Sequence, residues 1–107
     1  MLNLVAPDKV YIKTEPQRFS AGERGRLICQ STSSNPVAEI SWWKSGSLVH
    51  SVINNSEPGL YGGFISTAEL VLDLTEDMNS EAYTCQAKNV KIDKSVHQIT
   101  NLNVLCK

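Results

Sequence analysis

Apolar side chains in this chain recur at every second residue, in six short runs. A period of two is that of a β-strand, in which successive side chains point to opposite faces. Clusters of Gly, Pro, Asn, Ser and Asp, which favour turns, separate the runs. The sequence therefore predicts an all-β, antiparallel β-sandwich, with a single helical turn near residues 75–80 where the chain crosses between sheets. The apolar positions are Val10 and Ile12; Leu27 and Cys29; Ile40 and Trp42; Ala68, Leu70, Leu72 and Leu74; Tyr83, Cys85 and Ala87; and Leu102 and Val104.

Two cysteines, a tryptophan and a tyrosine occupy core-facing positions of these runs. Cys29 and Cys85 are 56 positions apart, Trp42 follows Cys29 by 13 residues, and Tyr83 stands two residues before Cys85. This order resembles the immunoglobulin sandwich, in which a disulfide joins strands B and F, a strand-C tryptophan packs on it, and a tyrosine secures the corner between strands E and F. The resemblance implies a Greek-key fold, a Cys29–Cys85 disulfide between the sheets, and core roles for Trp42 and Tyr83. The alternative is two separate buried thiols.

A disulfide that closes so long a loop is worth about 4 kcal/mol. It also implies an oxidising compartment, and hence an extracellular or secretory origin.

Several short motifs resemble an I-set or C2-type immunoglobulin domain of a cell-surface receptor. They are Gly22-Glu23 before Leu27-x-Cys29, Ile40-x-Trp42-x-x-x-Gly46, Leu70-x-Leu72 and Tyr83-x-Cys85-x-Ala87-x-Asn89. Two further stretches, Ser33-Ser34-Asn35-Pro36 and Leu102-Asn103-Val104-Leu105, are similar to nephrin-type adhesion receptors. The corner departs from the usual Asp-x-Gly-x-Tyr-x-Cys, because Glu81 stands where the family has glycine. The sequence therefore leaves the geometry of that turn undecided, although it predicts the fold.

The length of 107 residues suits one domain with one core. We expect residues 7–105 to form this domain, residues 1–6 to be the end of a preceding linker or an expression remnant, and residues 106–107 to begin a following linker. The start, Leu2-Asn3-Leu4-Val5, is similar to residues 102–105, although so short a match also arises by chance. No apolar run reaches the roughly 20 residues of a membrane helix, and the first residues lack the features of a signal peptide.

Charge and motif content argue against several function classes. A formal net charge of -1, with acids and bases mixed along the chain, offers no basic surface to nucleic acid or anionic lipid. His50 and His97 lack ligand spacing and a nucleophile context, and the chain has no Gly-x-Ser-x-Gly motif. The glycines of residues 59–63 lack the Lys-Ser/Thr of a phosphate loop. We expect a non-enzymatic domain without a metal, a cofactor or a small-molecule substrate.

Asn54 and Cys106 are candidates for covalent attachment, Asn54 to a glycan and Cys106 to a neighbouring domain or chain. Asn54-Asn55-Ser56 is the chain's one Asn-x-Ser/Thr sequon with a residue other than proline in the middle. It falls in the polar connection between strands C and E, where we expect a glycan to project into solvent. Cys106 lies past the last predicted strand and is either a thiol without function or a link to a neighbouring domain or chain.

The doubled tryptophan at residues 42 and 43 predicts a binding face. Because neighbouring strand residues point to opposite faces, Trp43 points outward if Trp42 lies in the core. The outward candidates for partner binding on strands C and F are Ser41, Trp43, Thr84, Gln86 and Lys88. An outward tryptophan is typical of an interface anchor. The alternative is that its own sheet covers it, for example through the stem of Lys88.

The resemblance implies a domain from the extracellular part of a nephrin-like, single-pass plasma-membrane receptor that acts in cell-cell adhesion or recognition. The resemblance implies partners of the immunoglobulin superfamily, Neph-type proteins on apposed cells among them, and neighbouring immunoglobulin domains of the same chain. The domain would act as a binding module or as a spacer. The alternatives are a domain of another cell-surface receptor, or an intracellular I-set domain of a muscle filament protein.

Overall fold

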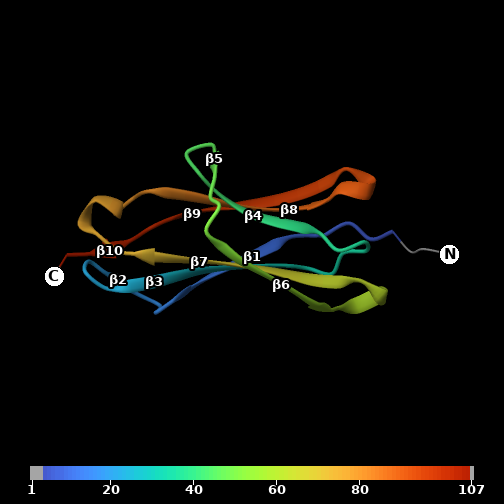
Figure 1. The fold of residues 1–107 in the computed structure, drawn as a ribbon, viewed down its shortest axis with the longest axis horizontal. Helices are drawn as coiled ribbons and strands as arrows, with labels where there is room; N and C mark the ends of the chain where they lie inside the picture. The colour runs from blue at the N-terminus through green and yellow to red at the C-terminus, as the bar shows by residue number, and fades with distance from the viewer. Residues whose placement is uncertain (1–3, 107) are drawn as a thin grey trace.

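The computed structural model describes residues 4–106 as two facing antiparallel β-sheets (Figure 1). The first sheet has the strand order β1-β3-β7-β6 and the second has the order β5-β4-β8-β9, while β2 and β10 form a short parallel pair. The strands are β1 (Val10–Glu15), β2 (Phe19–Ser20), β3 (Arg24–Ser31), β4 (Glu39–Lys44), β5 (Ser47–Leu48), β6 (Val52–Pro58), β7 (Phe64–Asp73), β8 (Ala82–Asn89), β9 (Lys94–Asn101) and β10 (Val104–Leu105).

Successive long strands cross between the sheets, which is what makes the topology a Greek key. The chain passes from β3 in the first sheet to β4 in the second, and later from β7 back to β8. Both sheets bury one face against the other, so the alternating apolar residues of β3, β4, β7 and β8 meet in a single core. The immunoglobulin-like sandwich that the sequence predicts is therefore confirmed.

In the described part of the chain, three single-turn 3-10 helices lie in the connections: η1 (Leu60–Gly62), η2 (Glu76–Met78) and η3 (Val90–Ile92). The second coincides with the helical turn predicted near residues 75–80. Among residues 4–106, no helix has the length and apolar character needed to cross a membrane.

Strands β5, β6 and β9 do not follow from the apolar alternation. The core-facing residues of β9 are Val96, Gln98 and Thr100, opposite Ala87, Cys85 and Tyr83, so two of the three are polar and the periodic signal is lost. The predicted last strand is correspondingly wrong in extent: β9 ends at Asn101, and Val104–Leu105 pairs in parallel with β2. The polar connection that carries Asn54 is also largely a strand, β6, which pairs with β7.

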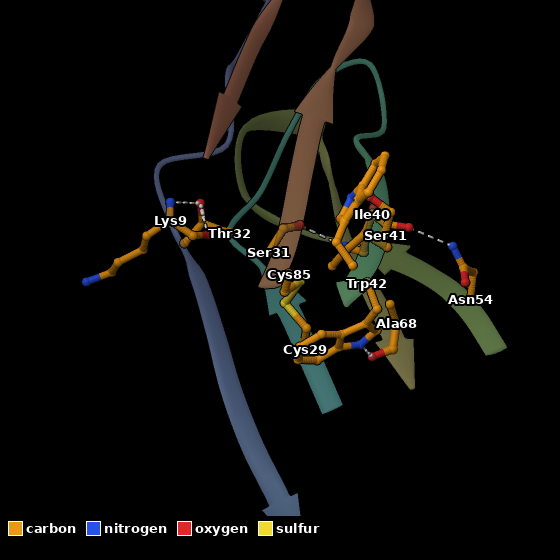
Figure 2. The surroundings of a disulfide bond; sticks show 12 residues. Lys9, Cys29, Ser31, Thr32, Ile40, Ser41, Trp42, Asn54, Ala68 and Cys85 are labelled. Atoms are coloured by element: carbon orange, nitrogen blue, oxygen red, sulfur yellow. Dashed lines mark hydrogen bonds between the residues drawn. A yellow bond between two sulfur atoms is a disulfide. The ribbon is translucent and has the colours of Figure 1, made fainter. Parts of the chain in front are cut away.

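The disulfide between Cys29 on β3 and Cys85 on β8 joins the two sheets, with 6.5 Å between the Cα atoms. The indole ring of Trp42 lies beside this bond and is fully buried (Figure 2). Its Nε1 atom donates a hydrogen bond of 3.0 Å to the carbonyl oxygen of Ala68, on β7 of the opposite sheet. Trp42 therefore connects the sheets a second time.

The corner between β7 and β8 shows why glutamate is tolerated in place of glycine. The positive φ of this turn, 73°, falls on Ser80 and not on Glu81. The Ser80 amide donates to the Leu102 carbonyl, and the Leu102 amide donates to the Glu81 carbonyl. The Asn79 side chain accepts a hydrogen bond of 3.0 Å from the Val104 amide. These bonds tie the corner to the end of the chain.

We predict that Trp42→Phe destabilises the domain by about 2–4 kcal/mol. Phenylalanine leaves part of the indole volume empty in the core. It also removes the hydrogen bond from the indole to the Ala68 carbonyl, and a bond of this kind contributes about 0.5–1.5 kcal/mol. Urea unfolding followed by circular dichroism measures the change as a lower midpoint at an unchanged slope. A loss below about 0.5 kcal/mol, the usual range for a surface substitution, would contradict this role.

Candidate binding face

The outward face of the second sheet is formed by β5, β4, β8 and β9. Trp42 and Trp43 are neighbours on β4, so with Trp42 buried against the disulfide, Trp43 stands on the outer face. The five residues predicted for partner binding (Ser41, Trp43, Thr84, Gln86 and Lys88) all lie on β4 or β8, and each is half-buried.

Strand register places four residues in a line across this face. Leu48 lies opposite Trp43, Trp43 opposite Thr84, and Thr84 opposite Ile99. We call Leu48, Trp43, Thr84 and Ile99 the apolar row. Leu48 and Ile99, at its two ends, are 41% and 59% exposed. Sequence reasoning misses both residues, because β5 and β9 lack the apolar alternation that would have placed their outward positions.

A polar row runs beside the apolar row. Ser41 lies opposite Gln86, and Gln86 lies opposite His97. The Nε1 atom of Trp43 donates a hydrogen bond of 2.9 Å to the Ser41 hydroxyl oxygen, which holds the indole over its own strand. The ring is thus oriented before any partner arrives, and its polar atom is already satisfied.

Lys88 does not lie in the same row as Trp43. It pairs with Glu39, two rows further along the sheet, and its ammonium group forms a 3.3 Å ion pair with Asp93. With a rise of about 3.3 Å per residue, four residues separate Lys88 from Thr84 by roughly 13 Å along β8. The immediate neighbours of Trp43 within its own sheet are therefore Ser41, Leu48 and Thr84.

A charged cluster of Lys44, Glu81 and Tyr83 lies at one end of the sandwich. The Lys44 ammonium group is 3.3 Å from Glu81 Oε2 and 5.8 Å from the centre of the Tyr83 ring. The hydrogen bond to Glu81 is the main cause that raises the pKa of Lys44. Burial raises the pKa of Tyr83, and the nearby Lys44 charge opposes part of that rise. Tyr83 is thus a buried core residue whose phenol is held in the neutral form.

Asn54 lies on β6, where its side chain reaches across to the second sheet. The Nδ2 atom donates a hydrogen bond of 3.0 Å to the carbonyl oxygen of Ile40 on β4 (Figure 2). The residue is nevertheless exposed, as are Asn55 and Ser56, which complete the sequon. Asn54 therefore combines an accessible position with a defined structural contact.

Asn89 is a fully buried polar residue whose role the sequence does not reveal. Its Nδ2 atom lies within 3.1–3.2 Å of the Val5 carbonyl, the Ser34 hydroxyl and the Pro36 carbonyl, and its Oδ1 atom accepts from the Lys91 amide at 3.1 Å. The partners are up to 84 residues away in the chain, so no local motif signals them. Asn89 joins the N-terminal segment to the loop that carries Ser33-Ser34-Asn35-Pro36.

The remaining candidate residues lie apart from the binding face. Cys106 is exposed, and its Sγ atom is 2.9 Å from Glu76 Oε1, a contact that raises the pKa of the thiol. Residues 1–3 and 107, which belong to the expected flanking segments, lie outside the described residues. Within residues 4–106, no group of three or more His, Cys, Asp and Glu side chains could hold a metal ion.

Comparisons with known proteins agree with this geometry. The family model described as the CD80-like C2-set immunoglobulin domain matches residues 5–95. Basigin of Cricetulus griseus is 38% identical over 104 residues, and human nephrin is 26% identical over 99 residues. Each alignment covers 92% of this chain, but the chain spans only 40% of basigin and 8% of nephrin. The three-domain ectodomain of mouse nectin-like molecule 4 superposes with a TM-score of 0.86 at 16% identity, over 96% of this chain and 35% of that structure.

We predict that Asn89→Asp destabilises the domain by about 3 kcal/mol or more at neutral pH. The substitution keeps the shape of the side chain but places a buried carboxylate against two carbonyl oxygens, where it can donate nothing. Asn101→Asp, at an exposed position of β9, introduces the same charge and is the matched control, with an expected change within about 0.5 kcal/mol. Urea unfolding measures both; equal stability of the two variants would contradict the buried role of Asn89.

We also predict that Tyr83 in the folded domain ionises at a higher pH than an ordinary tyrosine. The raised pKa means that, above the ordinary value of 10.0, the unfolded chain releases the Tyr83 proton while the folded chain still holds it. The contribution of Tyr83 to stability is therefore complete below pH 10.0 and is lost as the pH rises through the pKa of the folded state. Absorbance at the phenolate band, compared between the wild type and Tyr83→Phe, measures this. Reversible ionisation of Tyr83 at its ordinary pKa in the folded protein would contradict it.

Proposed function

Because this chain belongs to the C2-set immunoglobulin domains, we propose that it serves in cell-cell adhesion or recognition as one domain in the extracellular part of a plasma-membrane receptor. The chain spans a minor part of the relatives that it matches, so we assign this role to a domain within a longer receptor. The buried Cys29–Cys85 disulfide supports the extracellular location, because the reducing cytosol disfavours such bonds. It argues against the alternative of an intracellular filament protein.

The apolar row carries this proposal. Trp43 stands at the middle of a sheet face, between Leu48 and Thr84, while the described residues form only two layers and so leave this face uncovered. Tryptophan surrounded by partly exposed apolar and polar side chains is typical of the residues that dominate protein–protein binding energy. The hydrogen bond from its indole to Ser41 fixes the ring in advance, which lowers the entropy lost on binding.

The finer proposal is that the parent receptor is nephrin-like. Its partners would then be immunoglobulin-superfamily proteins of the cell surface, with Neph-type proteins on apposed cells as the first candidates. The nephrin alignment over 92% of this chain supports this, together with the Ser33-Ser34-Asn35-Pro36 stretch that Asn89 holds in place. The basigin alignment supports the alternative of a different cell-surface receptor.

A second candidate role is that of a spacer between domains. The domain measures 55 × 24 × 19 Å, and the described part of the chain, residues 4–106, begins and ends at opposite ends of the long axis (Figure 1). Domains of this shape, joined end to end, form a rod, and the hydrogen bond between Asn89 and the Val5 carbonyl would fix the direction in which the chain enters. Neighbouring immunoglobulin domains of the same chain would be the partners in this role.

We predict that Trp43→Ala weakens binding to an immunoglobulin-superfamily partner by about 30-fold or more. This corresponds to the roughly 2 kcal/mol or more that a central tryptophan contributes at such interfaces. The measurement is surface plasmon resonance of the secreted domain over an array of immunoglobulin-superfamily ectodomains that includes Neph-type proteins and the domain itself. Thermal unfolding of each variant shows that the fold is retained.

Tyr11→Ala is the matched control for this experiment. Tyr11 is an aromatic residue, 52% exposed, on β1 of the first sheet, and its partner in the strand register is Gln30 on β3 of the same sheet. We expect this variant to bind like the wild type. Equal binding by Trp43→Ala would disprove recognition through the apolar row, and no binding by the wild type to any ectodomain would favour the spacer role.

A further inference from the structure

We propose that Asn54 carries an N-linked glycan, and that the one N–H left on its amide nitrogen keeps the hydrogen bond to Ile40 that closes the edge of β4. The sequon Asn54-Asn55-Ser56 supplies the acceptor, and all three residues are exposed. The acceptor nitrogen, Asn54 Nδ2, already donates a hydrogen bond to the Ile40 carbonyl. The second part of the proposal is that this hydrogen bond persists after the glycan is attached.

The edge of β4 near Asn54 is not covered by a neighbouring strand. β5 pairs only with Trp43 and Lys44, so the first residues of β4 have no strand partner on that side within the described chain. Donors from three other segments satisfy the carbonyl groups along this edge. They are Ser66 Oγ to Ala38 at 2.8 Å, Asn54 Nδ2 to Ile40 at 3.0 Å, and the Val49 amide to Trp42 at 2.9 Å. Asn54 thus supplies the middle hydrogen bond of the three.

The chemistry of the acceptor allows both roles at once. A side-chain amide has two N–H groups, and among the described residues the Asn54 amide uses one, for Ile40. In glycosylation the bond from the sugar C1 to a polyprenyl diphosphate oxygen breaks and a C1–Nδ2 bond forms. Nδ2 loses one proton, and the lipid diphosphate departs with the electron pair of the broken bond. No oxidation occurs, and the product is a secondary amide that keeps one N–H donor.

The surface beside Asn54 has room for a sugar. A hollow of about 340 Å³ lies between β4 and β6 and is lined by Val37, Ile40, Asn54, Ser56 and Ser66 among others. A glycan leaving this hollow would stand over β6, the outermost strand of the first sheet, and hinder its pairing with a strand of another molecule.

The first test measures glycan occupancy on the 107-residue chain secreted from mammalian cells behind a supplied signal peptide. Ser56→Ala removes the hydroxyl of the sequon but leaves the Asn54 amide in place, whereas Asn55→Gln alters the middle residue and leaves the sequon intact. We expect intact-mass spectrometry to find a glycan on the wild type and on Asn55→Gln, and none on Ser56→Ala. A secreted wild-type protein without added mass would overturn the proposal.

The second test separates the glycan from the hydrogen bond. Trimming a high-mannose glycan with endoglycosidase H leaves one sugar on Nδ2 and keeps the N–H, whereas Asn54→Asp removes the donor and turns a carboxylate oxygen toward the Ile40 carbonyl. We expect the trimmed protein and Ser56→Ala to unfold at the same temperature within about 2 °C. Asn54→Asp should unfold about 5 °C lower or more, since roughly 1 kcal/mol shifts a domain of this size by that amount.

A charge control completes the second test. Asn55→Asp, introduced together with Ser56→Ala, adds the same negative charge at the neighbouring exposed position and keeps the Asn54 donor. We expect its unfolding temperature to stay within about 2 °C of that of Ser56→Ala. If Asn54→Asp is as stable as this control, or if the trimmed protein is as unstable as Asn54→Asp, the structural role of the remaining N–H is wrong.

Discussion

The position of Trp42 beside the Cys29–Cys85 disulfide is the contact on which the rest of the sandwich depends. The disulfide joins β3 to β8, and the Trp42 indole reaches from β4 to the Ala68 carbonyl on β7, so the two contacts connect four strands from both sheets. Together they fix the rotation of β4 about its axis. Once that rotation is set, Trp43 must stand on the outer face and the carbonyl of Ile40 must point to the open edge.

The parts of the fold that follow from the sequence are those in which burial requires apolar side chains. Strands β3, β4, β7 and β8 lie at the centre of the sandwich, their inward residues are apolar, and the alternation predicts them. β6 and β9 are the outermost strands, where inward residues such as Asn54 and Gln98 meet polar groups or water and no longer need to be apolar. The alternation is therefore lost at the edges for a physical reason.

The same reason limits prediction of the candidate site. The face around Trp43 can be predicted on β4 and β8 because parity follows from the buried Trp42 and Cys85, whereas Leu48 and Ile99 belong to strands without that pattern. Polar contacts between segments that are distant in the sequence are still harder to predict. Asn89 meets a hydroxyl 55 residues away, and the corner at Ser80 and Glu81 takes its geometry from bonds to Leu102. Sequence spacing contains no signal for either.

Edges and faces of this sandwich offer a partner different kinds of contact. An open strand edge binds through backbone groups, which are the same for every sequence, and it invites pairing with any other strand. Here side chains of Asn54 and Ser66 donate hydrogen bonds to carbonyl groups along the open part of β4, so a further strand would compete with them for these acceptors. The outer face keeps its side chains accessible, with Trp43 oriented by Ser41. Recognition through the face rather than the edge depends on side-chain identity, which is the requirement for a domain that distinguishes among many partners of the same fold.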